Sequence, residues 1–322
     1  MPLLKSNYKA PFLFRSAHFS TIYASLLRKV KIEVFKRERV ELSDGDFLDL
    51  DWCYAKNGNY RQLMIVTHGL AGSADRPYML GMAKAFSEKG FDVALINFRS
   101  CSGETNRLFR SYNAGATEDL KEVIDLCLQK KKYEKIVLSG FSLGGNLLLK
   151  YLGETENLPK EIKAAVAVSV PSDLGASLKE LDKQKNYLYS RRFLKKLKNQ
   201  LYERQQLFPK KIDKINIAAC NSLLAIDELY TSKAHGYKDA ADYYEKCSSL
   251  QFLPNISIPT LLINAKNDSF LSESSHPLGI AKNSEFLHLE MPEYGGHVGF
   301  FRKEDFTIMK NGHWSFAASF RL

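Results

Sequence analysis

The amino-acid sequence predicts an α/β protein with a mostly parallel central sheet that is flanked by helices. Short, wholly apolar runs, such as those at 63–67 and 164–170, are typical of strands buried on both faces. They alternate along the chain with helix-like segments, as parallel strands joined by crossover helices do. The chain has 322 residues, of which 45% are hydrophobic, so it is long enough for one large domain with an insertion or for two domains.

The first part of the chain lacks this alternation. Residues 1–30 carry aromatic side chains without a clear period. We expect them to form an arm that packs one or two helical turns against the core, with His18 buried in a structural role. Residues 31–54 predict a β-hairpin whose first strand begins at Ile32 and whose turn lies at 44–46.

The core is expected to consist of six further strands and the helices between them. One predicted helix opens at Pro77, and others begin at Thr117 and Asn146. This order puts a helix between successive strands, as a parallel sheet requires. The predicted strands span 63–67, 91–97, 135–139, 164–170, 260–264 and 286–290.

Residues 171–250 interrupt the pattern because they contain no buried strand. Between positions 189 and 201, apolar side chains fall on one helical face and basic ones on the other. Since the sheet resumes afterwards, we expect a helical cap inserted after the sixth core strand. The predicted division is an arm at 1–30, the first part of the core at 31–170, a cap at 171–250 and the second part of the core at 251–322.

A glycine-flanked serine stands between a predicted strand and a predicted helix. The pattern is Gly140-Phe141-Ser142-Leu143-Gly144. A serine at a sharp strand-to-helix turn needs small neighbours, because a Cβ at Gly140 or Gly144 would collide across the turn. This context is typical of the nucleophile elbow of the α/β-hydrolase fold, which is the fold class that we predict.

Two further residues fit the same chemistry. Asp268 and His297 each follow a predicted strand, and the chain order Ser…Asp…His is that of the α/β-hydrolases. The C-terminal ends of parallel strands share one edge of the sheet, so Ser142, Asp268 and His297 are expected to meet there. His297 would accept the Ser142 proton, and Asp268 would orient the imidazole. Asp173, just after the preceding strand, is the alternative acid.

Two backbone N–H groups are candidates for binding the negative charge that develops on a substrate oxygen. Leu143 follows the candidate nucleophile, and Leu70 lies in the loop after His68-Gly69. These are the positions at which the fold supplies an oxyanion hole. His68 itself is expected to stabilise the loop and not to take part in catalysis.

The positive net charge of the chain, +10, is concentrated in one segment. Between residues 179 and 214, twelve lysines and arginines stand against four acidic residues. We expect a solvated helix face there, and the alternative is peripheral contact with an anionic membrane. Nothing else in the sequence indicates nucleic-acid binding.

Other sequence features indicate a cytoplasmic protein without a metal. No run has the length of a membrane span, and the N-terminus lacks the apolar core of a signal peptide. The five cysteines are scattered, without a C-x-x-C pair, so we expect reduced thiols. No histidine and carboxylate group has metal-ligand spacing, and we expect no metal and no cofactor.

Five motifs together resemble those of a known family. They are Arg15-Ser-Ala-His18 with Thr21-Ile22, His68-Gly-Leu-Ala-Gly-Ser73, Asn97-Phe-Arg-Ser-Cys-Ser-Gly103, Gly140-Phe-Ser-Leu-Gly-Gly-Asn146 and Gly295-Gly-His-Val-Gly-Phe300. The chain is thereby similar to the AB hydrolase 4 (YheT-like) family of the α/β-hydrolase superfamily.

This resemblance implies a serine esterase or lipase-type activity on carboxylic esters, with Ser142, Asp268 and His297 as the catalytic triad. Two departures stand out. The family often has a histidine after Tyr112, where this chain has Asn113, and the tail at 301–322 shows only a weak terminal helix.

We therefore predict a serine hydrolase that cleaves carboxylic esters through an acyl-serine intermediate. The Tyr, Leu and Phe side chains of the cap favour a small-molecule ester with an apolar acyl chain. A thioesterase or an amidase would use the same residues. The alternative from a different class is a protein that keeps the fold without the chemistry and binds a membrane surface or a partner. The sequence leaves the oligomeric state open.

Overall fold

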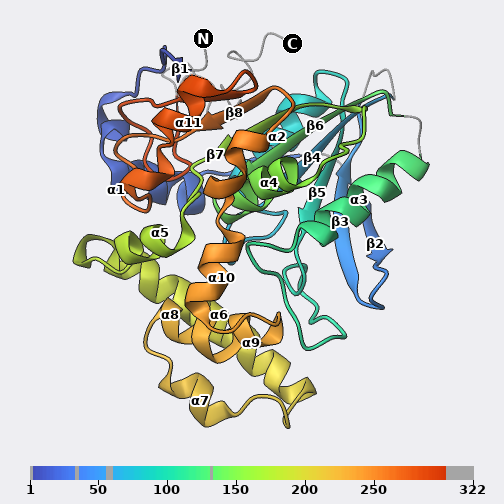
Figure 1. Cartoon of the computed structure of the whole chain (residues 1–322), viewed down its shortest axis with the longest axis vertical. Coiled ribbons are helices and arrows are strands. Elements are labelled where there is room, and N and C mark those ends of the chain that lie inside the picture. Colours follow the sequence, from blue (N-terminus) through green and yellow to red (C-terminus); the bar gives the residue numbers. More distant parts are fainter. Residues whose placement is uncertain (1–2, 33–35, 56–60, 131–132, 302–322) are drawn as a thin grey trace.

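The computed structural model describes residues 3–32, 36–55, 61–130 and 133–301, and its centre is a nine-stranded sheet (Figure 1). The strand order is β1-β9-β8-β7-β6-β4-β5-β3-β2, and every pair is parallel except β2–β3 and β3–β5. The predicted α/β class with a mostly parallel sheet is confirmed. The strands are β1 (Leu3–Leu4), β2 (Lys36–Glu41), β3 (Phe47–Cys53), β4 (Gln62–Thr67), β5 (Asp92–Asn97), β6 (Lys135–Phe141), β7 (Ile162–Val168), β8 (Thr260–Ile263) and β9 (Leu287–Glu290).

The predicted hairpin is confirmed, with one difference at its start. β2 and β3 pair antiparallel, and the Leu42 N–H donates to the Asp46 carbonyl at 2.9 Å across the turn. The first strand begins at Lys36 and not at Ile32, and part of the expected start, 33–35, lies outside the described residues. Ile32 packs instead against the hydrophobic cluster that α2 covers, so its apolar character reflects packing and not strand pairing.

The arm contributes an edge strand that the sequence did not predict. β1 pairs parallel with β9, with Leu3 opposite Leu289, and the Ser6 hydroxyl donates to Glu290 Oε1 at 2.7 Å. A strand of two residues is too short to leave an alternating pattern, so periodicity could not reveal it.

The helical turns expected in the arm are present, but the prediction that His18 is buried is wrong. His18 is only half-buried, and its Nδ1 lies 3.1 Å from the Tyr189 hydroxyl of α6. The arm is therefore in contact with the helices that follow β7. Its helical elements are η1 (Phe12–Arg15), α1 (Ala17–Ile22) and η2 (Tyr23–Leu27).

Helices cover both faces of the sheet. Along β4, Leu63 and Ile65 belong to the core beneath α3 and α4, whereas Met64 and Val66 belong to the core that α2 covers. This burial on two faces explains why the strand reads as an unbroken apolar run. The helices are α2 (Pro77–Ser87), α3 (Thr117–Lys130), α4 (Leu143–Glu154) and α11 (Leu278–Asn283).

Between β7 and β8 the described chain forms helices and no strand. These helices lie together below one end of the sheet in Figure 1. α6 is 21 residues long, and no helix among the described residues combines the length and apolarity needed to cross a membrane. The elements are α5 (Leu174–Leu181), η3 (Gln184–Asn186), α6 (Tyr187–Leu207), α7 (Lys214–Ala219), α8 (Leu223–Ile226), η4 (Asp227–Thr231), α9 (Ser232–Ala234), α10 (Ala240–Cys247) and η5 (Ser249–Asn255).

The loop after β9 is fastened to other parts of the chain. The Val298 N–H donates to the Ser169 hydroxyl at 2.9 Å, and the Phe301 N–H donates to the Tyr8 hydroxyl at 2.9 Å. The weak terminal helix expected in the tail falls on 302–322, which lie outside the described residues.

A buried ion cluster ties the loop after β5 to the hairpin and to α3. The Arg99 side chain is 1% exposed and donates two hydrogen bonds to Asp119, at 2.7 and 2.8 Å, and one to Asp46 at 3.1 Å. Asp46 and Asp119 are themselves buried. Breaking such a pair leaves an uncompensated charge in the interior.

Replacing Arg99 should therefore destabilise the protein strongly. We expect Arg99→Met to lower the free energy of unfolding by about 3–5 kcal/mol, measured by urea denaturation. Arg37→Met is the matched control, because the Arg37 side chain is 50% exposed where it pairs with Asp51. Its loss should be less than about 1 kcal/mol. Equal losses in the two variants would contradict this assignment.

Candidate active site

Ser142 occupies a strained turn between β6 and α4. Its backbone has φ 53° and ψ −123°, a region that non-glycine residues avoid. A Cβ at Gly140 would stand 2.6 Å from the Gly144 carbonyl oxygen, which explains why small residues flank the serine. The turn leaves Ser142 at the C-terminal end of a central parallel strand, where α/β folds place their sites.

The structure brings Ser142, Asp268 and His297 together. His297 Nε2 lies 2.9 Å from Ser142 Oγ, and His297 Nδ1 lies 2.8 Å from Asp268 Oδ2. Because a carboxylate only accepts, Nδ1–H donates to Asp268, and Nε2 is the ring nitrogen that faces the serine hydroxyl. The three residues follow β6, β8 and β9, whose C-terminal ends share one edge of the sheet.

The Asp268–His297 pair is held from two sides. The Asp268 side chain is 0% exposed, and its second oxygen accepts the Phe270 N–H at 3.0 Å. The Phe270 ring stacks on the imidazole with centroids 4.3 Å apart. Sequence reasoning missed Phe270, which carries no pattern beyond its nearness to Asp268.

The alternative acid, Asp173, has a different place. It caps α5, where Oδ1 accepts the Ala176 N–H at 3.0 Å, and Oδ2 accepts the Ser274 hydroxyl at 2.7 Å. Among the described carboxylates, Asp268 is the one that bonds to His297.

The arm also positions the histidine loop. Thr21 Oγ1 accepts the His297 backbone N–H at 2.9 Å and donates to the Ala17 carbonyl at 2.7 Å. The Arg15 carbonyl accepts from the Asn267 side chain at 3.0 Å, next to Asp268. The sequence analysis did not assign Thr21 a role, although the motif at 15–22 was the signal that could have found it.

The candidate oxyanion donors lie on either side of the serine. Leu143 is the first residue of α4, where a backbone N–H has no acceptor within the helix. The loop that carries Leu70 passes close to the serine, since a Cβ at Gly69 would be 3.5 Å from Ser142 Oγ. Leu70 lines both cavities that reach Ser142.

His68 stabilises this loop as a neutral side chain. Its Nδ1–H donates to the Gly69 carbonyl at 2.8 Å, and its Nε2 accepts the Phe98 N–H at 3.2 Å. Burial lowers the pKa of His68 to about 4. Both ring nitrogens are thus occupied by backbone groups, in agreement with the expected structural role.

Two cavities of about 120 Å³ each meet at Ser142 and His297. The first opens between the arm and α6, with Ile22, Leu26 and Arg192 in its wall. The second extends beneath the helices that follow β7, and its wall is mostly apolar. Its apolar lining consists of Leu70, Leu143, Pro171, Leu174, Leu178, Leu181, Phe193, Leu197, Leu223 and Phe270.

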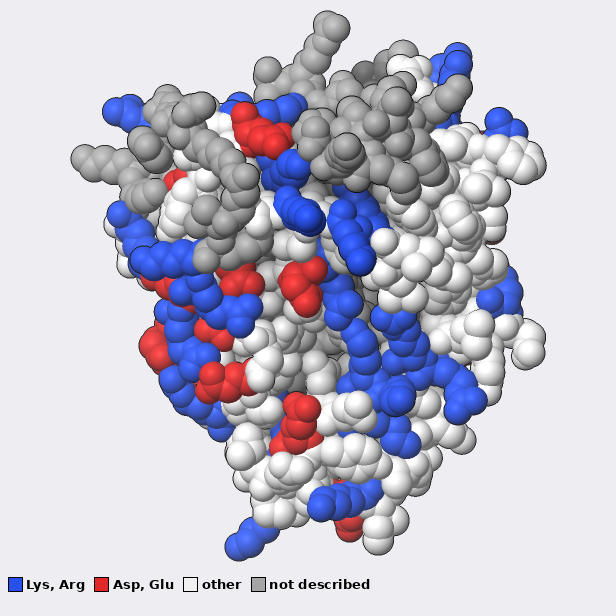
Figure 2. All heavy atoms as spheres, turned by 180° about the vertical axis from the view of Figure 1, so that it is seen from behind, with Lys and Arg blue, Asp and Glu red and all other residues white. Residues whose placement is uncertain are grey.

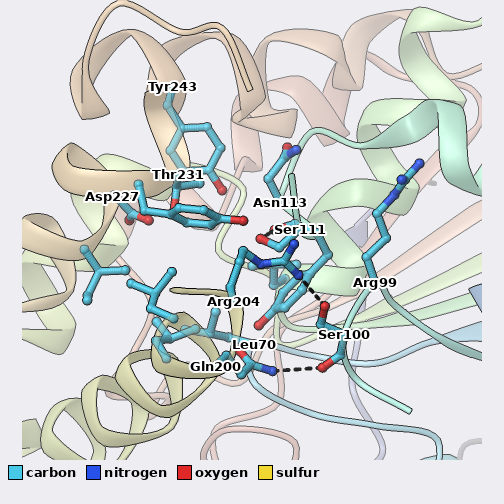
Figure 3. Close-up of a pocket in the computed structure, with 16 residues that line it drawn as sticks. Leu70, Arg99, Ser100, Ser111, Asn113, Gln200, Arg204, Asp227, Thr231 and Tyr243 are labelled. Atoms are coloured by element: carbon cyan, nitrogen blue, oxygen red, sulfur yellow. Dashed lines mark hydrogen bonds between the residues drawn. The ribbon is translucent and has the colours of Figure 1, made fainter. Parts of the chain in front are cut away.

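A third, smaller cavity of about 50 Å³ adjoins the second and is more polar in its side chains (Figure 3). Arg204 and Gln200 project from α6 toward Ser100, whereas Asp227 and Tyr243 lie on the opposite side. The guanidinium of Arg204 is buried and also donates to the Phe109 and Arg110 carbonyls, both at 3.1 Å.

Comparison with known proteins identifies the family of this chain. Residues 62–304 match the family described as "alpha/beta hydrolase fold". YheT of Escherichia coli (strain K12), which carries the name of an esterase, is 36% identical over 89% of this chain and 85% of its own. The chain belongs to the AB hydrolase 4 (YheT-like) family of the α/β-hydrolases.

Other family relatives are named as lipid hydrolases. Phospholipase ABHD3 of Bos taurus is 28% identical over 93% of this chain and 74% of its own. Human monoacylglycerol lipase ABHD2 is 27% identical over 93% of this chain and 76% of its own. Among solved structures, the Pyrococcus furiosus esterase Pf2001 has a TM-score of 0.57 at 17% identity, covers 88% of this chain and 93% of its own, and shares the fold.

The sequence analysis missed Asp227, a titratable residue that lies where two cavities meet. Its Oδ2 accepts the Tyr244 hydroxyl at 2.6 Å, and it lines both the second and the third cavity. Burial raises the pKa of Asp227 from 3.8 to about 6. The folded state therefore binds this proton more tightly than the unfolded state.

The stability of the protein should consequently fall as the pH rises from about 4 to about 6, through this group. Asp227→Asn removes the titration, so the variant should gain up to about 3 kcal/mol over the natural protein between these limits. Urea unfolding of both proteins at several pH values measures the difference. If the free energies of unfolding of the two proteins differ by a constant amount from pH 4 to pH 7, burial does not raise the pKa of Asp227.

Proposed function

We propose that the protein is a serine hydrolase that cleaves carboxylic esters through an acyl-serine intermediate. The observation that carries the proposal is the pair of hydrogen bonds at His297, one to Ser142 and one to Asp268. Membership of the hydrolase family and the names of its relatives support it. Ser142, Asp268 and His297 are then the catalytic triad.

In the first step Ser142 Oγ attacks the ester carbonyl carbon while its proton passes to His297 Nε2. Asp268 keeps the ring in the tautomer that can accept this proton and stabilises the imidazolium that forms. The imidazolium then gives the proton to the leaving alcohol, which departs and leaves Ser142 acylated. A water molecule, activated by the same imidazole, releases the acid and restores the serine.

The negative charge on the tetrahedral intermediate needs donors that are already in place. The backbone N–H groups of Leu70 and Leu143 are the proposed oxyanion hole, and one such donor is typically worth about 3 kcal/mol of barrier. The helix that begins at Leu143 adds the positive end of its dipole on the same side.

The proposed substrate is an ester with an apolar acyl chain. The second cavity begins at Ser142, and its apolar wall gives a hydrocarbon chain a place away from water. Helices of the segment 171–250 supply Leu174, Leu181 and Phe193 to this wall, and we treat the segment as a cap on a core formed by 31–170 and 251–322. The relatives named phospholipase and monoacylglycerol lipase make a lipid ester the favoured class.

A fluorophosphonate probe tests the nucleophile. The probe should label the natural protein at Ser142, and Ser142→Ala should abolish labelling and lower kcat for p-nitrophenyl butyrate by about a millionfold. Ser87→Ala, on helix α2, is the matched control and should label normally. Absence of labelling in the natural protein, with an intact unfolding transition, would refute the proposal.

Thr21 provides a second, finer test of the site. Thr21→Val removes the acceptor for the His297 N–H and should lower kcat by about tenfold, with little change in KM, because the histidine loop loses one hydrogen bond. Thr21→Ser keeps the hydroxyl and should retain most of the activity. A loss shared equally by both variants would indicate a packing role instead.

A further inference from the structure

The opening of the first cavity is bounded by two segments that are far apart in the sequence. Ile22 and Leu26 come from the arm, and Arg192 and Lys196 come from α6. Ser142 and His297 lie in the same cavity. Any substrate that enters by this route passes between apolar arm side chains and basic helix side chains.

Large apolar side chains are exposed in both of these segments. Leu26 and Ile22 of the arm line the cavity and are 47% and 38% exposed, and Leu188 of α6, one helical turn before the cavity-lining Arg192, is 77% exposed. Leu27 beside them is 59% exposed. Several exposed apolar side chains on one rim, next to a ligand cavity, are typical of an interaction surface and not of an ordinary solvated face.

The same rim is strongly basic. Leu188, Arg192 and Lys195 are spaced by four and three residues, so they share one face of α6. Figure 2 shows a cluster of lysines and arginines on the lower right with few acidic side chains around it. The surrounding segment, 179–214, holds twelve basic residues against four acidic ones.

We propose that this rim, formed by Ile22, Leu26 and Leu27 of the arm and by Leu188, Arg192 and Lys195 of α6, docks on a bilayer that contains anionic lipids. The leucines and isoleucine would enter the interfacial region, and the basic side chains would lie at the lipid phosphates. Charge complementarity and the exposed apolar groups around one opening favour a lipid surface over an acidic protein partner. The docking extends the proposed function, because it would present lipid esters directly to the opening above Ser142.

Vesicle co-sedimentation of the full chain tests the docking. The protein should bind vesicles of phosphatidylcholine with phosphatidylglycerol, bind pure phosphatidylcholine far less, and lose binding as salt is raised. Lys195→Glu and Leu188→Ser should each lower the partition coefficient by about tenfold. Circular dichroism and the unfolding midpoint establish that the variants are folded.

Two control variants carry the same chemical changes away from the rim. Lys210→Glu lies in the same basic segment beyond the end of α6, and Ile215→Ser removes a side chain of α7 that is 75% exposed. Both should bind vesicles much like the natural protein, apart from a small loss from net charge at Lys210. Equal losses at rim and control sites, or failure of the natural protein to bind anionic vesicles, would overturn the proposal.

The docking and the proposed chemistry can fail separately. Ser142→Ala should bind vesicles as the natural protein does, because the serine lies inside the cavity and not on the rim. Normal fluorophosphonate labelling without vesicle binding would overturn the docking alone. Vesicle binding without labelling would overturn the ester hydrolase and leave a membrane-surface protein.

Discussion

The site depends on the His297 imidazole, because this ring joins segments that are far apart in the sequence. One ring nitrogen meets the serine at the end of β6, and the other meets the aspartate after β8. The backbone of the same residue is held by Thr21 of the arm. A small shift in any of these segments lengthens a hydrogen bond that must be short for the proposed proton transfer.

The sheet alone does not set this geometry. Parallel strands bring β6, β8 and β9 to one edge, but the strained backbone of Ser142 and the left-handed residue Val298 decide where the side chains point. The Val298 N–H is fixed by Ser169, which is itself left-handed. Such strain persists only where the surrounding packing over-determines it, and here it is concentrated around the serine and the histidine.

Chain order and strand position were enough to predict the fold class and to nominate Ser142, Asp268 and His297. The C-terminal ends of parallel strands lie at one edge of the sheet, so residues that follow different strands become neighbours there. The contributions of Thr21 and Asp227 were not predictable in the same way. Thr21 reaches the histidine loop through an arm without periodicity, and Asp227 lines a cavity formed only when the helices after β7 assemble. His18 was expected to be buried and is not, since its neighbour is the half-exposed surface of α6.

The basic residues of α6 pair with backbone carbonyls where they reach inward. Lys196 donates to the Ala71 carbonyl at 3.1 Å, Lys198 to the Ala218 carbonyl at 2.8 Å, and Arg204 to the carbonyls of the loop at 108–110. A carbonyl satisfies a cation's hydrogen-bonding capacity without cancelling its charge. Carboxylate partners would instead have offset these three positive charges. Because these side chains pair with carbonyls, the segment keeps its positive potential. This potential is the property that an anionic lipid surface would recognise.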